Sequence, residues 1–221
     1  MFSTEFELVD FFVNVSKKKN KFYIKELSTN FGRPDIVELS VNIEVFNERK
    51  RVQNTVDIPD IQRIDTYILA YLKGKSWVKK KTVAKFLNLE ISTLNASIKR
   101  LVRRRMLDVE SELVKMRSVK ELLFITSLTV FEAKLTNWKY VIEQAERHLW
   151  FSRQSYILLP ELSEDIQRKA EELAIKRGVG LAITNHEEIL FKTKKIPNKI
   201  INTPLLWEIN EGIIDGKFII E

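Results

Sequence analysis

The chain has 221 residues, of which 44% are hydrophobic, and it carries a formal net charge of +7. It has no cysteine and only two histidines, His148 and His186, which lack the spacing of metal ligands, so the sequence offers neither a disulfide nor a zinc site. No apolar run is long enough to cross a bilayer, and the N-terminus lacks a signal-peptide cleavage site. We therefore expect a globular, cytoplasmic protein without a membrane partner, and the basic excess favours a polyanionic partner.

The first part of the chain predicts a helix followed by two strands. Residues 4–16 (TEFELVDFFVNVS) place apolar side chains along one side of a helix. Residues 21–30 (KFYIKELSTN) and 35–46 (DIVELSVNIEVF) alternate between apolar and polar positions, as strands do, and FGRP between them predicts a turn. The two strands are therefore expected to pair as a hairpin.

Three short helices are predicted next, in a strongly basic segment. Between Lys73 and Arg105, eleven basic residues accompany a single acidic residue. Apolar residues recur at helical spacing in residues 61–74, 79–89 and 92–108. Outside this segment the charges nearly balance, so the net positive charge of the chain is clustered here.

The third of these helices leads into a predicted pair of strands. Ser92 is expected to be its N-cap residue. Its inward-facing residues are predicted to be Leu94, Ile98, Leu101 and Val102. Residues 106–117 (MLDVESELVKMR) then alternate as two strands or a wing would. Three short helices and a wing resemble a winged helix-turn-helix domain of the kind common in transcription regulators, over residues 58–117.

This resemblance implies that the third helix enters the major groove of duplex DNA while the wing follows the backbone. Asn95 is expected to read a base edge, and the lysines and arginines to contact phosphates. The predicted DNA-binding residues are Lys79, Lys80, Lys81, Thr93, Asn95, Lys99, Arg100, Arg103, Arg104 and Arg105. Two other interpretations stay open: a basic face that is only solvated, and a winged helix that binds another protein.

Strands and helices alternate in the rest of the chain. Strands are predicted over residues 121–135, 155–160, 179–184 and 188–193. Helices are predicted over residues 137–154 and 163–178, the second with Ser163 as N-cap residue and Gly178 as C-cap residue. The apolar C-terminal stretch, residues 203–221, is expected either to form an interface or to cap the core.

Charged residues lie at the ends of two predicted strands. Pro34 and Asp35 open the second strand, whereas Glu132-Ala133-Lys134 closes the third. Residues two apart on a strand point to the same face, so Glu132 and Lys134 are expected to project together, with Asp35 near them. Two carboxylates provide the hard oxygen ligands that suit Mg²⁺. A Pro-Asp turn or a Glu-x-Lys triplet is common by itself, so the interpretation depends on their conjunction.

With residues 58–117 set aside, the order of elements and these motifs resemble the PD-(D/E)xK nuclease superfamily. The resemblance implies an α/β fold, with a restriction endonuclease-like mixed sheet flanked by helices, built from residues 1–57 and 118–221. It also implies that Asp35 and Glu132 bind Mg²⁺, for which Mn²⁺ can substitute, and that Lys134 positions or activates the attacking water.

Two further residues match positions that some members of the superfamily use. Gln144, in the helix after the triplet, matches a glutamine that orients the metal site or substrate. Glu7, on the N-terminal helix, matches an extra acidic metal ligand, with Glu5 and Asp10 as nearby alternatives. Packing rather than chemistry is the expected role of His148, Trp138, Trp150 and Phe151.

The sequence as a whole therefore predicts a Mg²⁺-dependent DNA endonuclease whose inserted winged helix binds double-stranded DNA. A homodimer is expected, because cutting both strands needs two active sites. The main alternative is a non-catalytic DNA-binding regulator or recombination accessory protein on a nuclease scaffold. A third interpretation, a subunit of a multi-protein transposition machine, fits less well, because the winged helix would then follow the nuclease core rather than interrupt it.

Overall fold

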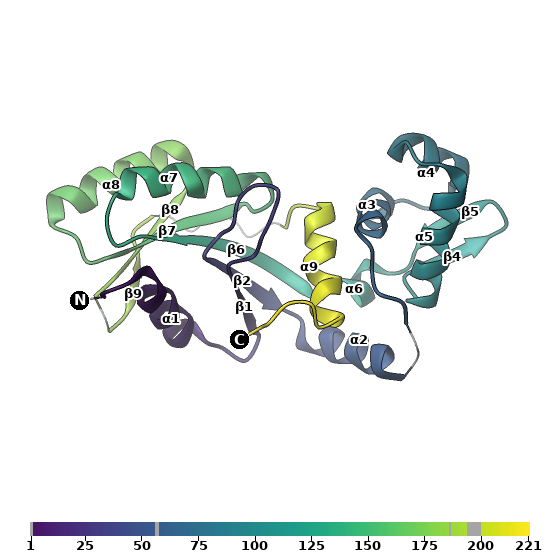
Figure 1. The fold of residues 1–221 in the computed structure, drawn as a ribbon, viewed down its shortest axis with the longest axis horizontal. Helices are drawn as coiled ribbons and strands as arrows, with labels where there is room; N and C mark the ends of the chain where they lie inside the picture. The colour runs from purple at the N-terminus through teal and green to yellow at the C-terminus, as the bar shows by residue number, and fades with distance from the viewer. Residues whose placement is uncertain (1, 56–57, 186, 194–199) are drawn as a thin grey trace. The chain divides into compact units, whose positions relative to one another are not determined.

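The computed structural model describes residues 2–55, 58–185, 187–193 and 200–221, so His186 lies outside the described residues (Figure 1). The chain divides into two compact units. Unit 1 comprises residues 1–41, 126–201 and 220–221, and unit 2 comprises residues 42–125 and 202–219. The predicted class, an α/β protein with a mixed sheet flanked by helices, is confirmed.

Unit 1 is built on a six-stranded sheet with the strand order β1-β2-β6-β7-β8-β9. β6, β7 and β8 are parallel, whereas the pairs β1–β2 and β8–β9 are antiparallel. The strands are β1 (Lys21–Lys25), β2 (Ile36–Val41), β6 (Ile125–Ala133), β7 (Gln154–Pro160), β8 (Gly180–Thr184) and β9 (Ile189–Phe191). The helices are α1 (Glu5–Ser16), α7 (Trp138–Arg147), the 3₁₀ helix η1 (His148–Trp150) and α8 (Glu164–Arg177).

Helices cover both faces of this sheet, with α1 on one side and α7 and α8 on the other (Figure 1). Tyr156 and Leu158 of β7 pack in the core that α1 covers. Ile157 and Leu159 of the same strand pack in the core formed with α7 and α8. Successive side chains of a strand point to opposite faces, so the nearly continuous apolar sequence of β7 follows from burial on both faces.

The local signals predicted most of these elements correctly, although several predicted bounds were too long: the strand predicted over residues 121–135 begins at Ile125, and the helix predicted over residues 137–154 ends with η1 at Trp150. Ser163 and Gly178 flank α8 as expected, with Gly178 in the left-handed conformation that favours glycine. The second strand, however, ends at Val41 and not at residue 46. The side-chain oxygen of Asn42 accepts hydrogen bonds from the backbone N–H groups of Glu44 and Val45, and this cap starts a helix.

Unit 2 combines helices with a small antiparallel sheet of strand order β3-β5-β4. Its helices are α2 (Ile43–Thr55), α3 (Arg63–Leu72), α4 (Lys80–Leu87), α5 (Ile91–Arg103), α6 (Val119–Leu122) and α9 (Pro204–Ile214). Its strands are β3 (Val78–Lys79), β4 (Leu107–Glu110) and β5 (Leu113–Met116). The three predicted helices of the basic segment and the strand pair after them are therefore present.

Details of unit 2 differ from the prediction. α5 begins at Ile91 with Glu90, not Ser92, at its N-cap position. Leu94, Ile98 and Leu101 are buried as expected, but the side chain of Val102 is 42% exposed. The fourth buried residue of this helix is Ser97, which directly precedes Ile98. The inward face is therefore rotated slightly from the one predicted.

The C-terminal stretch belongs to unit 2. Trp207 of α9 is fully buried in the hydrophobic core that α3, α4 and α5 form. Residues 202–219 thus group with the basic segment and not with the six-stranded sheet, in which they were expected. This stretch was expected either to form an interface or to cap the core, and it covers the core of unit 2.

No helix among the described residues is both long and apolar enough to cross a membrane.

Candidate active site

The start of β2 and the end of β6 lie next to each other at one edge of the unit 1 sheet. The Thr126 hydroxyl, near the start of β6, donates to the Ser40 carbonyl near the end of β2. At the other end, the backbone N–H of Ala133 donates to Asp35 Oδ2 over 2.7 Å. The two strands therefore run in opposite directions, and this arrangement brings Asp35 beside the last residues of β6.

Asp35 and Glu132 form a closely spaced pair of carboxyl groups. The pKa of Asp35 is raised to about 6. Burial is the main cause; the negative charge of Glu132 and a hydrogen bond with its carboxyl group raise the pKa further, whereas the Ala133 N–H and the charge of Lys134 lower it. Such a perturbed carboxyl group beside a second one is typical of functional sites.

His148 is the residue of this site that sequence reasoning missed. Its Nε2 lies 2.5 Å from Glu132 Oε1, and the two side chains are 1% and 5% exposed. The ring lies against Gly32, where an added Cβ would come within 3.3 Å of His148 Cε1. His148 directly follows α7, which packs on the sheet face toward which Glu132 points. The two residues therefore meet only because α7 packs on that face.

Lys134 is the third of the predicted catalytic residues. Its Nζ donates to Glu5 Oε2 over 2.6 Å. This bond is the main reason why the pKa of Lys134 is raised, and the charges of Asp35 and Glu132 raise it further, although burial lowers it. Lys134 is therefore a protonated ammonium group at neutral pH. We call Asp35, Glu132, Lys134 and His148 the Asp35 cluster.

The acidic residue of α1 that reaches this cluster is Glu5 and not Glu7. Glu7 Oε2 accepts a hydrogen bond from the backbone N–H of Ser3, and the Glu7 N–H donates to the Thr4 hydroxyl. Glu7 thus closes a capping arrangement at the start of α1. It is exposed and engaged there, so the structure does not bring the predicted third acidic ligand to the site.

Gln144 of α7 lies four residues, about one helical turn, before His148, the C-cap residue of that helix. Its Oε1 and the Nδ1 of His148 are buried and have no hydrogen-bond partner among the described residues. Buried polar atoms without partners are uncommon and are found where a ligand or water belongs. Within the same described ranges, no group of three or more His, Asp or Glu side chains is arranged to hold a metal ion.

In unit 2, most of the predicted DNA-binding residues are exposed on or beside α4 and α5. The exposed residues are Lys79, Lys81, Thr93, Asn95, Lys99, Arg103 and Arg105. Lys80 is partly buried, and its Nζ donates to the carbonyl of Ser111 over 2.6 Å, in the turn between β4 and β5. Arg100 is also engaged, because two of its nitrogens donate to the fully buried carboxylate of Asp65.

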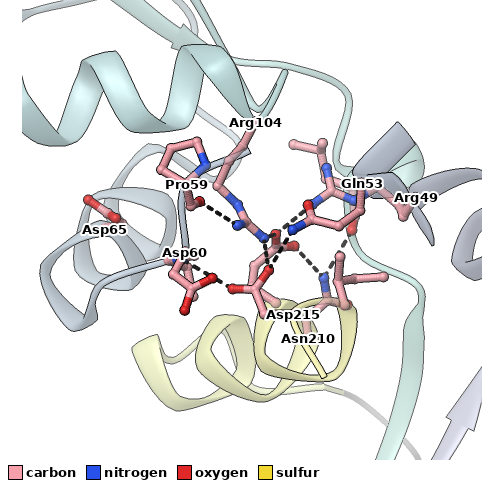
Figure 2. Close-up of polar contacts among 12 residues, drawn as sticks. Arg49, Gln53, Pro59, Asp60, Asp65, Arg104, Asn210 and Asp215 are labelled. Atoms are coloured by element: carbon pink, nitrogen blue, oxygen red, sulfur yellow. Dashed lines mark hydrogen bonds and ion pairs between the residues drawn. The ribbon is translucent and has the colours of Figure 1, made fainter. Parts of the chain in front are cut away.

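Arg104 was predicted to contact DNA, and the structure contradicts this prediction. Only 2% of Arg104 is exposed, and its Nη2 pairs with Glu211 at 2.7 Å and with Asp215 at 2.8 Å (Figure 2). Nη1 donates to the carbonyl of Pro59, and Glu211 also pairs with Arg49. We call Arg49, Arg104, Glu211 and Asp215 the Arg104 cluster.

The residues of the Arg104 cluster come from α2, α9 and the ends of α5 and α9, far apart in the sequence. The charge on Arg104 is therefore used inside unit 2, where it holds these segments together. The sequence could not distinguish Arg104 from its neighbours Arg103 and Arg105. The three arginines are adjacent, and only the conformation at the end of α5 decides which of them points inward.

No protein-family model matches this chain, and no curated protein or solved structure is significantly similar to it.

Proposed function

We propose that this protein is a Mg²⁺-dependent DNA endonuclease of the PD-(D/E)xK type, with unit 1 as its nuclease core. The observation that carries the proposal is the convergence of Asp35, Glu132 and Lys134 at one edge of a mixed sheet, with the pKa of Asp35 raised to about 6. Asp35 lies about a hundred residues before Glu132 and Lys134 in the sequence. Two carboxylates that can hold a metal ion, beside a lysine, suit the hydrolysis of a phosphodiester.

The two carboxyl groups fit a Mg²⁺ ion, which is commonly held by one or two carboxylates and keeps several of its waters. One oxygen of each group is held in place by the protein: Asp35 Oδ2 by the Ala133 N–H, and Glu132 Oε1 by His148. The carboxyl groups also share a hydrogen bond, which needs a proton that a divalent cation can replace. Bound there, Mg²⁺ would polarise the phosphate and lower the pKa of a water ligand.

Lys134 supplies a fixed positive charge. Because its pKa is raised, it donates hydrogen bonds and does not accept a proton from water at neutral pH. Its ammonium group would orient the attacking water and stabilise the charge that develops on the phosphate as the new P–O bond forms and the bridging P–O bond breaks. Glu5 holds the ammonium group in position through its 2.6 Å contact.

We propose that unit 2 binds duplex DNA in the manner of a winged helix. Its support is the succession of α3, α4, α5 and the β4–β5 hairpin, with Thr93, Asn95 and Lys99 exposed on α5. The exposed lysines and arginines around this helix would contact phosphates, which makes binding depend strongly on salt. Cleavage of both DNA strands would require two copies of the chain, and therefore a homodimer.

A second candidate is a DNA-binding protein that does not cut. It is favoured by one observation: among the residues that the structure describes, no three metal-ligating side chains are grouped. With only two carboxylates, the site could serve as scaffold while unit 2 performs the binding.

A plasmid assay separates the two candidates. Supercoiled DNA is incubated with Mg²⁺ or Mn²⁺ and the wild-type chain, Lys134→Ala, or the control Lys176→Ala, which changes an exposed lysine on α8. Nicked or linear product from the wild type and the control, but not from Lys134→Ala, is the expected result. Equal cleavage by all three proteins would remove Lys134 from the chemistry. Intact plasmid together with retained DNA binding would favour the protein that does not cut.

A further inference from the structure

Two aromatic side chains of unit 1 are exposed side by side. Trp150 is 73% exposed and Phe31 is 38% exposed. Their ring planes differ by only 8°, and the ring centroids are 6.4 Å apart. Trp150 was expected to lie in the core or at an interface rather than to stack on bases, and its exposure excludes the core. Two adjoining exposed rings form a small contiguous apolar patch, and such patches serve as binding surfaces.

The loop that carries Phe31 is held in a fixed shape. The backbone N–H of Thr29 donates to the Gly32 carbonyl, and the Thr29 hydroxyl donates to the same oxygen. The N–H of Phe31 in turn donates to the Thr29 hydroxyl oxygen. Gly32 has a φ of +114°, which favours glycine and closes the turn. The Phe31 ring is therefore positioned before any ligand binds.

The aromatic pair adjoins the Asp35 cluster. Phe31 also packs against Phe151, at a centroid distance of 6.0 Å, and Phe151 lies 5.6 Å from the ring of His148. His148 contacts Glu132 directly. Gly32 follows Phe31 and lies against the same histidine. Two consecutive ring contacts thus connect the exposed pair to the candidate catalytic carboxylates.

Two exposed arginines lie near Trp150 in the sequence. Arg147 precedes it by three residues and Arg153 follows it by three. Neither makes an ion pair with another residue in the described part of the chain, whereas the nearby acid Glu146 is paired with Arg177. Guanidinium groups contact phosphates and aromatic rings stack on nucleobases, so these residue types together suit a nucleic acid.

We propose that Phe31 and Trp150 form a stacking platform for an unpaired nucleotide of DNA, with Arg147 and Arg153 at the adjacent phosphates. A paired base keeps its faces covered by neighbouring bases, so only a base that has left the stack can lie on these rings. The inference deepens the proposed function, on which it rests: the preferred substrate is DNA that carries an unpaired nucleotide beside the bond to be cut.

Binding without cleavage tests the platform. The full chain is titrated in EDTA, by fluorescence anisotropy, with a paired duplex, the same duplex carrying one extra unpaired nucleotide, and a third in which that nucleotide is abasic. Base stacking on an aromatic side chain predicts about 5- to 150-fold tighter binding of the duplex with the unpaired base than of the other two. Trp150→Ala should abolish this preference, and Trp150→Phe should keep most of it.

Tyr140→Ala is the matched control, because Tyr140 is 51% exposed on the preceding helix, away from the pair in sequence. It should leave the preference unchanged, and thermal melts of every variant establish that it is folded. Equal affinities for the three duplexes in the wild type, or an unchanged preference in both Trp150→Ala and Phe31→Ala, would overturn the platform. If the protein prefers the unpaired base but does not cut plasmid under any of the conditions tested, the platform is supported and the proposed nuclease function is rejected.

Discussion

Each unit contains a cluster of charged side chains, and the two clusters differ in whether each carboxylate is paired with a cation. In the Arg104 cluster of unit 2, two arginines face two carboxylates, and every carboxylate has a guanidinium partner. Burial lowers the pKa of Arg104, but Glu211 and Asp215 more than offset this effect and raise it. In the Asp35 cluster of unit 1, by contrast, two carboxyl groups face each other.

The difference indicates which cluster is structural and which is available for chemistry. A neutralised cluster gains nothing by binding an ion, because its desolvation cost is already met by its own partners. The pair of carboxyl groups has the opposite property: the pKa of Asp35 is raised to about 6, so the folded protein would gain by accepting a cation there. Three predictions test this contrast and a fourth tests the DNA interface, the one with the largest effect first.

Arg104→Met should lower the free energy of unfolding by about 3–5 kcal/mol, because Glu211 and Asp215 would stay buried without their partner. Urea denaturation measures the loss. Lys99→Met on the same basic stretch is the control: Lys99 is exposed, and its substitution should change the free energy by less than about 0.5 kcal/mol. Equal stability of the two variants would mean that the Arg104 cluster does not hold unit 2 together.

His148→Ala should reduce kcat about 10- to 100-fold with little change in KM for DNA, because Glu132 would lose the donor that orients it. His148→Gln retains a nitrogen donor at a similar reach and should recover part of the activity. Steady-state cleavage assays over a range of DNA concentrations separate the two parameters. A rise in KM alone would assign His148 to DNA binding.

Asp35→Asn should stabilise the protein at pH 8 by about 1–2 kcal/mol, after allowance for the partial exposure of Asp35. Its pKa is about 6 in the folded state, above the unfolded value of 3.8, so the folded state retains a proton that the unfolded state has lost. The free energy of unfolding of the wild type therefore falls as the pH rises from 3.8 to about 6. Above this range it stays at the lower value.

The same pair of proteins provides the control for this pH dependence. Below about pH 3, Asp35 is mostly protonated in both states, and the wild type and Asp35→Asn should have nearly the same melting temperature. Thermal melts at pH 3 and pH 8 test the sign. A variant that is less stable than the wild type at pH 8 would contradict the raised pKa.

Lys99→Ala should weaken binding of paired duplex only a few-fold and lower the slope of log Kd against log salt by about one unit, as expected for the loss of one phosphate contact. Its stability should not change. Lys120→Ala, an exposed lysine of α6, is the matched control, and its salt slope should equal that of the wild type. An unchanged slope for Lys99→Ala would remove the exposed face of α5 from the DNA interface.

The fold class and the three residues Asp35, Glu132 and Lys134 could be selected from the sequence because each signal is local. A strand alternates, a cap residue is adjacent to its helix, and a charged residue at a strand end is visible in the letters. The continuation of the second strand past Val41 was a wrong choice between two local signals: alternation went on to residue 46, but Asn42 is also a good N-cap residue.

His148, Arg104 and Trp150 could not be assigned in this way. His148 meets Glu132 only because α7 packs across the sheet, and Arg104 meets Glu211 only because α9 returns from 107 residues further along the chain. Trp150 has the sequence context of a core residue, with Leu149 and Phe151 as neighbours. Which of three adjacent apolar residues points outward depends on η1, a short helix that the sequence does not distinguish from the end of α7.

The Arg104–Glu211 contact also has a consequence for how the protein is made. The ribosome adds about 5–20 residues per second. The 107 residues between the two partners therefore take roughly 5 to 20 s to synthesise. During that time α9 is missing, so Arg104 lacks Glu211 as a partner and the core of unit 2 lacks Trp207. Strands β6 to β9 of the six-stranded sheet are synthesised in the same interval. A nascent chain arrested before α9 should expose the core of unit 2 to chaperones and proteases, and release of the last segment should end that exposure.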